Sequence, residues 1–123
     1  ATVMYDAAHV MGLVAGGQFQ DPLREGADVM TGSSHKTFPG PQGGFVLSDS
    51  EDEKLHRRLN SGIFPGVCSS YHLHHMAGKT IALSEFEEFG QSYAEDIVSN
   101  AQALGAALSS EGFDVIAEEF PDL

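Results

Sequence analysis

Two short apolar segments near the start of the chain restrict most strongly what this sequence can fold into. Residues 2–5 end at an acidic residue, and residues 27–31 end in small polar residues. Apolar runs of this length bounded by polar residues are typical of buried strands. Between them, residues 10–15 fit a short helical turn and residues 21–26 fit a second one. This strand, helix, strand order predicts an α/β sheet.

The middle of the chain predicts a third strand and two helices. The strand is expected at residues 45–47, after a turn rich in Gly and Pro at residues 39–44. Ser50 and Glu53 then form a capping box, which predicts the start of a helix. Residues 71–89 lack proline and are rich in helix formers, so they predict one long helix.

The last part of the chain predicts another amphipathic helix and a strand. Its apolar residues recur every three or four positions after Tyr93, at Ile97, Ala101, Leu104 and Leu108. Gly112 is expected to end this helix, and alternating residues at 113–117 predict a strand.

The charge of the chain excludes one class of function. Six Lys and Arg against eighteen Asp and Glu give a formal net charge of −12, so we expect no binding of nucleic acid driven by charge. Ten acids and no Lys or Arg occupy residues 80–123. We interpret them as a solvated helix face rather than a partner-binding surface, and they also suit a protein adapted to high salt.

The length of 123 residues suits one domain, although the chain opens inside an apolar run without Met, so we expect an incomplete chain. No apolar run approaches the roughly 20 residues that a membrane helix needs, and we expect no membrane association. The single cysteine, Cys68, fits a reducing compartment and a cytoplasmic location. We expect Cys68 to be a small buried residue rather than a reactive thiol.

Two residues at the predicted strand ends are candidates for binding a ligand. Asp6 ends the first strand and Lys36 follows the second, so both would emerge at the carboxyl edge of the sheet, where open α/β sheets bind ligands. Pyridoxal phosphate needs a lysine amine for its Schiff base and an acid opposite its pyridine nitrogen. The alternatives are a surface lysine in a turn and an acid that caps a helix or a turn.

The segments at residues 6–10 (Asp-Ala-Ala-His-Val) and 34–44 (Ser-His-Lys-Thr-Phe-Pro-Gly-Pro-Gln-Gly-Gly) resemble the serine hydroxymethyltransferase family. Residues 60–66 and the helix with His74, Ala77, Gly78 and Lys79 continue this resemblance. It implies an α/β fragment of a fold-type-I transferase that depends on pyridoxal phosphate, with the aspartate-aminotransferase-like large domain in three α/β/α layers. Residues 1–70 would be part of that cofactor-binding domain, 71–92 a long connecting helix, and 93–123 the start of the C-terminal small domain.

The resemblance also implies roles for individual residues. Lys36 would form the Schiff base with pyridoxal 5'-phosphate, with His35 beside it as a second catalytic residue. Asp6 would bind the pyridine nitrogen, His9 would reach the ring hydroxyl, and Ala8 would pack on the ring face. Lys54, on a charged helix, and Lys79, on the long helix away from the strand edges, are the lysines without such a role.

Three serines complete the cofactor contacts that the resemblance implies. Ser33 takes the position of a family threonine near the cofactor. Ser69 and Ser70 stand where the family has two glycines that bind the phosphate of the neighbouring subunit's cofactor, and backbone N–H groups before a helix suit that role. The site would therefore be shared between subunits of a homodimer or a dimer of dimers.

The implied activity is the interconversion of serine and glycine by retro-aldol chemistry, with transfer of one carbon unit to tetrahydrofolate or tetrahydromethanopterin. The substrate would be a small amino acid. The alternatives are a folate-independent aldolase for β-hydroxy amino acids, a methylserine-type hydroxymethyltransferase, and a non-catalytic structural relative. Retention of both Asp6 and Lys36 argues against the last, because a scaffold needs neither.

A cluster of histidines precedes and begins the predicted long helix, at His72, His74 and His75. On a helix His72 and His75 share a face while His74 points elsewhere, and no Cys or acid stands at a suitable spacing, so we expect no metal. Packing at a subunit interface or a contact beside the cofactor is the preferred interpretation.

Overall fold

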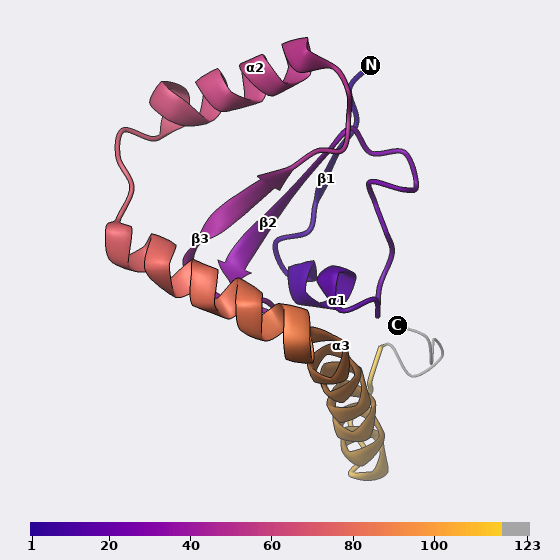
Figure 1. Cartoon of the computed structure of the whole chain (residues 1–123). Helices are drawn as coiled ribbons and strands as arrows, with labels where there is room; N and C mark the ends of the chain where they lie inside the picture. The colour runs from indigo at the N-terminus through magenta and orange to yellow at the C-terminus, as the bar shows by residue number, and fades with distance from the viewer. Residues whose placement is uncertain (117–123) are drawn as a thin grey trace.

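The structure is a computed structural model that describes residues 1–116. Its strands and helices follow one another in the order β1 (Met4–Asp6), α1 (Met11–Ala15), β2 (Val29–His35), β3 (Pro39–Leu47), α2 (Glu53–Ser61), the irregular helical segment η1 (Gly62–Val67) and α3 (Leu73–Ser110). Figure 1 shows the sheet between α2 above and the long helix α3 below. Among the described residues, no helix is both long enough and apolar enough to cross a membrane.

The sheet has three strands in the order β1-β2-β3. β1 and β2 are parallel neighbours, with Asp6 opposite Thr31, so their carboxyl ends lie at one edge of the sheet as expected. β3 runs antiparallel to β2 and includes the segment 39–44 that the sequence predicts as a turn. The pairing of β2 with β3 becomes irregular between Ser33 and His35, directly before Lys36.

The core lies between the sheet, α1 and the first half of α3. It contains Ala7, Met11, Met30, Phe38 and Ala82, and Phe45 and Phe86 pack against them. The Phe38 ring contacts the Phe45 ring edge-on at 5.3 Å between centroids and the Phe86 ring at 4.9 Å. These aromatic contacts join the loop after β2 to both β3 and α3, so the segment that follows Lys36 is held from two sides.

α1 and α3 approach each other through small residues. A Cβ atom on Gly16 would overlap the side chain of Ala94 and would lie 2.7 Å from the carbonyl oxygen of Gly90. Both Gly90 and Ala94 are buried. Only residues without a large side chain allow two helix backbones to come this close.

Several local predictions differ from the structure. The two helices expected at 71–89 and from Tyr93 form one continuous helix, α3, because Gly90 is used for close packing and does not end it. Residues 21–26 form hydrogen-bonded turns and no helix. The backbone N–H of residue 25 bonds the carbonyl of residue 21 and that of residue 27 bonds the carbonyl of residue 22, which is not the regular series of a helix. Residues 113–116 are not a strand, and residue 117 of that predicted strand lies outside the described residues.

The start of α2 also differs from the predicted capping box. Asp52 is the N-cap, and its Oδ1 atom accepts a hydrogen bond of 2.8 Å from the backbone N–H of Lys54. Ser50 accepts one from the N–H of Asp52 instead. The carboxylate of an N-cap aspartate accepts a hydrogen bond from a free N–H group, and its negative charge interacts favourably with the positive end of the helix dipole. Asp52 therefore caps the helix in place of the serine.

Candidate functional site

The carboxyl edge of the parallel pair brings two predicted site residues to one side of the sheet. β1 ends at Asp6, and β2 ends at His35, directly before Lys36. Because Asp6 pairs with Thr31, Lys36 stands five residues further along the chain than the partner of Asp6, at most about 17 Å away in an extended chain. Both residues therefore belong to the same end of the parallel strand pair.

Asp6 is exposed and keeps part of its carboxylate free. Its Oδ1 atom accepts a 2.9 Å hydrogen bond from the N–H of Ala8, which is the turn-acid geometry that the sequence left open. Within the part of the chain that the structure describes, the second oxygen has no protein partner. The turn thus fixes the carboxylate and leaves one oxygen for a ligand.

The loop that follows Asp6 is tied to the loop that carries Lys36. The Thr37 hydroxyl donates a 2.7 Å hydrogen bond to the carbonyl of His9 and accepts a 3.0 Å bond from the N–H of Gly12. One side chain therefore fixes the distance between the His9 and Lys36 segments. Sequence reasoning did not single out Thr37; its only signal was its place directly after the lysine.

Ser34 fixes the chain on the N-terminal side of Lys36. It is fully buried, and its hydroxyl donates a 2.7 Å hydrogen bond to the carbonyl of Pro41 in β3. This bond lies where the regular pairing of β2 with β3 breaks down. Lys36 itself is exposed, and its amine has no partner among the described residues. Ser34 was also missed, because a serine in a Ser/Thr-rich segment does not reveal which hydroxyl is buried.

His35 and Ser33, two other predicted site residues, pair with β3. The Nδ1 atom of His35 lies 3.2 Å from the carbonyl oxygen of Gly43 and 3.3 Å from its nitrogen. Ser33 is half-buried and lies opposite Gly44. Both residues therefore stand close to Lys36 in the chain, and the histidine ring is held by the backbone of the neighbouring strand.

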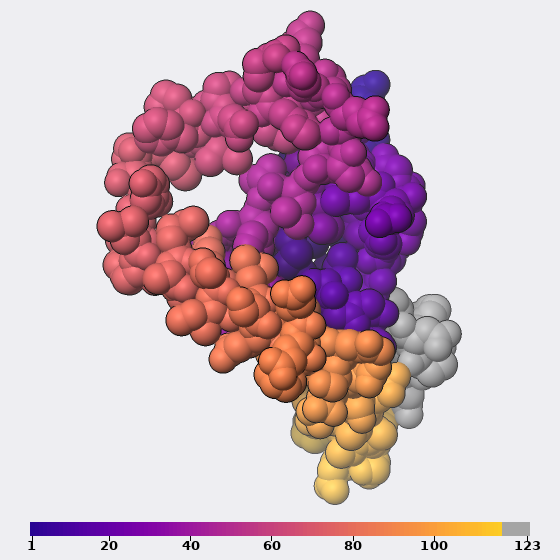
Figure 2. Space-filling view, in the orientation of Figure 1, coloured from indigo at the N-terminus to yellow at the C-terminus, as the bar shows by residue number. Residues whose placement is uncertain are grey.

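Ser69 and Ser70 are not brought to Asp6 and Lys36. They are exposed and lie in the segment between η1 and α3, which Figure 1 shows passing well outside the sheet. In the space-filling view the chain between β3 and α3 encloses open space (Figure 2). Cys68 in this segment is exposed, which corrects the expectation of a buried cysteine.

The three histidines form one cluster at the start of α3. The ring centroids of His74 and His75 are 4.3 Å apart, and His72 lies 5.3 Å from His75 and 5.5 Å from His74, so His74 does not point away as expected. Partial burial and the positive charges of His74, His72 and Lys79 lower the pKa of His75 below its ordinary value of 6.5. In the described chain, no group of His, Cys, Asp or Glu is arranged to hold a metal ion.

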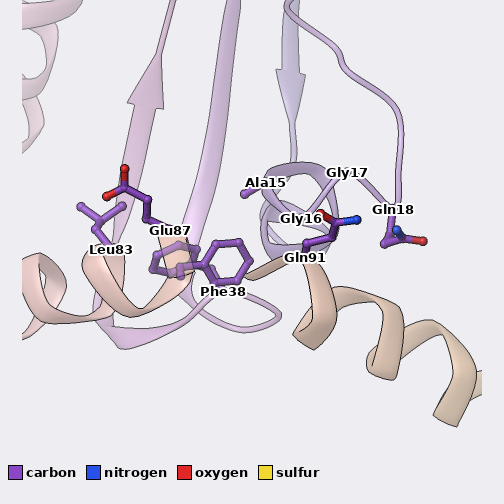
Figure 3. Close-up of a pocket in the computed structure, with 9 residues that line it drawn as sticks. Ala15, Gly16, Gly17, Gln18, Phe38, Leu83, Glu87 and Gln91 are labelled. Carbon is purple, nitrogen blue, oxygen red and sulfur yellow. The ribbon is translucent and has the colours of Figure 1, made fainter. Parts of the chain in front are cut away.

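A cavity of about 630 Å³ lies apart from these residues, between the end of α1 and α3. Figure 3 shows Phe38 in the middle of its lining, with Leu83 and Glu87 on one side and Gly16 and Gln91 on the other. None of the predicted site residues lines this cavity. The candidate site is therefore the exposed sheet edge and not this hollow.

The match to a family model covers residues 1–120 of this chain, and that model is described as serine hydroxymethyltransferase. The chain belongs to the serine hydroxymethyltransferase family. It is 61% identical over 120 residues to the serine hydroxymethyltransferase of Pyrococcus horikoshii and 57% identical over 119 residues to that of Methanobrevibacter smithii. Each match covers 97% of this chain and 28% of the relative, so the chain spans just over a quarter of the length of these family members.

A solved structure confirms the expected fold class. The chain matches the crystal structure of an L-threonine transaldolase from Pseudomonas fluorescens in its internal aldimine state, with a TM-score of 0.91 and 39% identity. The match covers 98% of this chain and 28% of that one. The described residues are therefore an α/β fragment of a fold-type-I enzyme.

Proposed function

We propose that the whole protein is a serine hydroxymethyltransferase that depends on pyridoxal phosphate and interconverts serine and glycine by retro-aldol chemistry. One observation supports the proposal: β1 ends at Asp6 and β2 ends directly before Lys36, at the same edge of a parallel strand pair, and Thr37 bonds the loop that follows Asp6 at His9. The family membership and the 61% identity to a relative of that name support it.

The residues at this edge fit the cofactor. A carboxylate with one free oxygen, an imidazole and a primary amine, all exposed, are the groups that a phosphorylated pyridine aldehyde requires. When bound, this cofactor supplies an electron sink for carbanions formed at the substrate's Cα. In our proposal Asp6 holds the proton on the ring nitrogen, His9 contacts the ring hydroxyl and Ala8 packs on the ring face.

In this proposal Lys36 is the residue that would hold the cofactor covalently, through its side-chain amine. The bond forms only from the neutral amine, so a proton must leave Nζ first. Ser34 and Thr37 fix the backbone on both sides of Lys36, so only the lysine side chain needs to rotate. Ser33 lies near the cofactor, and His35 is the second residue that we assign to the catalytic site.

We propose further that the site is completed by a second copy of the chain. The segment between α2 and α3, with the first residue of α3, exposes large apolar side chains at Phe64 (60%), Val67 (83%), Tyr71 (71%) and Leu73 (74%). Ser69 and Ser70 lie within this apolar stretch, away from their own Asp6 and Lys36. A homodimer that covers the stretch would bring both serines to the partner's cofactor phosphate. A dimer of dimers repeats the same contact.

The domain organisation and the location of the protein remain part of the proposal. We assign residues 1–70 to the cofactor-binding large domain, 71–92 to a connecting helix and 93–123 to the start of the small domain. Because α3 is continuous, this last boundary would fall inside a helix. The single cysteine supports a reducing, cytoplasmic location.

A second activity is favoured by the match to a threonine transaldolase. A folate-independent enzyme for β-hydroxy amino acids would use the same Lys36 and Asp6 but would need no pterin. Release of glycine from L-serine only in the presence of tetrahydrofolate or tetrahydromethanopterin supports the hydroxymethyltransferase. Equal release of glycine from L-threonine or another β-hydroxy amino acid without a pterin supports the aldolase.

The decisive experiment reduces the whole protein with borohydride and locates the modified lysine by mass spectrometry. We expect the adduct on Lys36. Lys36→Ala should lose the adduct and at least about a thousandfold in turnover, while the cofactor still binds through Asp6 and His9. Lys54→Ala, on α2, is the matched control and should keep both. An adduct on Lys54, or one that survives in Lys36→Ala, would contradict the proposal.

A further inference from the structure

Lys79 is the only Lys or Arg in α3, and it points onto the sheet. Its Nζ atom donates a 3.3 Å hydrogen bond to the carbonyl of Gly44 and lies 5.6 Å from the centroid of the Phe45 ring. The side chain is half-buried. The sequence-based expectation that Lys79 lies away from the strand edges is therefore wrong, because Gly44 pairs with Ser33 near the end of β2.

Gly43 makes room for this lysine. Its φ angle of 152° is one that residues with a side chain rarely adopt. A Cβ atom at this position would overlap Lys79 Nζ and would lie 2.8 Å from Lys79 Cε. The backbone of β3 at residues 43–44 is thus shaped around the lysine side chain.

The same glycine holds the His35 ring. His35 Nδ1 is within hydrogen-bond distance of both the N–H and the carbonyl of Gly43, at 3.3 and 3.2 Å. With a proton on Nδ1 the ring donates to the carbonyl, and without one it accepts from the N–H. In either tautomer the ring next to Lys36 therefore depends on the backbone of Gly43 for its hydrogen bond.

We propose that Lys79 is a positioning residue: it fixes residues 43–44 of β3, and through Gly43 it sets the orientation of the His35 ring and of the strand end that carries Lys36. Lys79 reaches the site only through Gly43 and His35 and touches no reacting atom in this scheme. The inference rests on the proposed function only in that Lys36 carries the cofactor.

The test compares Lys79→Met with the wild-type whole protein. Methionine keeps an unbranched side chain over Phe45 and removes the donor to Gly44. In the cofactor-free protein, selective ¹⁵N labelling of histidine, with the His35 signals assigned from His35→Gln, reports the ring tautomer and its hydrogen bond. We expect the Nδ1 and Nε2 signals of His35 to shift in Lys79→Met and to return in Lys79→Arg, which restores a donor.

The loaded protein gives a second measurement. The pH midpoint of the cofactor's visible absorbance depends on the surroundings of Lys36, and we expect a shift of at least about 0.3 pH unit in Lys79→Met. Turnover should fall about tenfold. Gly43→Ala should produce the same spectral shift by displacing the lysine. Lys54→Met, on α2, is the control and should leave both measurements unchanged.

Two results would overturn the inference and leave the proposed function intact. They are His35 signals in Lys79→Met that match the wild type, and an unchanged absorbance midpoint in a variant that folds normally by circular dichroism. Absence of a lysine adduct in the wild-type protein would instead overturn the proposed function, while the His35 signals of the cofactor-free protein would still test Lys79.

Discussion

Thr37 is the residue that joins the two halves of the candidate site, because its hydroxyl both donates to His9 and accepts from Gly12. Thr37→Val keeps the shape of the side chain but leaves both backbone groups without this partner. We expect a loss of about 1–3 kcal/mol in the free energy of unfolding, measured by urea denaturation of the cofactor-free whole protein.

Thr37→Ser keeps the hydroxyl and removes the methyl group, so it separates the contribution of the hydrogen bonds from that of the methyl group. It keeps both hydrogen bonds and should cost less than about 1 kcal/mol. Val and Ser variants of equal stability would show that the two hydrogen bonds do not hold the loops together, and Thr37 would then not be the link between the two halves of the site.

The placement of Asp6 and Lys36 could be predicted from the sequence because it depends only on where two strands end and on the direction of those strands. The roles of Ser34 and Thr37 could not. Thr37 bonds residues 25 and 28 positions away in the chain, and the burial of Ser34 depends on an antiparallel partner that the sequence did not reveal. Such long-range contacts leave no local pattern.

At the scale of elements, β3 shows why the predicted turn at 39–44 was wrong. Pro39 and Pro41 have no N–H to donate, and the sequence rules treat them as strand breakers. In the structure β3 lies at the edge of the described sheet and pairs with β2 alone. An edge strand tolerates proline, and the glycines of this segment serve close contacts, such as that of Gly43 with Lys79.

The contact between α1 and α3 predicts a large effect of one methyl group. Gly16→Ala would push its Cβ into Ala94 and the carbonyl of Gly90, so the two helices must separate. We expect a loss of about 1–3 kcal/mol in the free energy of unfolding. Gly62→Ala is the matched control, because its φ is −67° and no atom lies within 4 Å of the added Cβ. A Gly16→Ala protein as stable as Gly62→Ala would contradict this packing.

The histidine cluster at the start of α3 predicts how stability depends on pH. The pKa of His75 is lowered in the folded protein from 6.5, by partial burial first and then by the charges of His74, His72 and Lys79. Below pH 6.5 the unfolded chain therefore binds more protons than the folded one, and stability falls as the pH drops through the lower folded value. Above pH 6.5 the contribution of His75 is fully present.

His75→Gln should reduce this slope. The measurement is the thermal midpoint of the whole protein as a function of pH on both sides of 6.5, in the wild type and in His75→Gln. The matched control is His56→Gln, an exposed histidine on α2 outside the cluster. A wild-type slope that persists in His75→Gln would show that the cluster does not act through this residue.

At the scale of the whole molecule, the described chain has one packed half and one open half. The sheet, α1 and the first half of α3 share the core. The second half of α3 exposes Leu104 (62%) on the apolar face that the sequence predicts. Periodicity indicates that such a face exists, but it does not identify what packs on it. Figure 2 shows this part of α3 projecting from the body of the molecule.

The charge of the chain leads to a prediction about salt. The net charge is −12, and the described residues contain one ion pair, Arg57 with Glu53 at 3.1 Å. On α3, Glu85 and Glu88 are exposed three residues apart, where like charges repel. Salt shortens the range of this repulsion from about 10 Å at 0.1 M to about 3 Å at 1 M. We therefore expect the thermal midpoint of the whole protein to rise with KCl concentration over this range.

Variants of charge separate this repulsion from general effects of salt on folding. The double change Glu85→Gln and Glu88→Gln removes two negative charges, so it should raise the thermal midpoint at about 0.1 M KCl and flatten its rise with salt. Lys54→Gln removes a positive charge from α2 and should steepen that rise. The three proteins should converge at high KCl, because screening then leaves little repulsion to relieve. A midpoint that does not rise with KCl, or equal slopes in all three, would contradict an adaptation of this acidic surface to high salt.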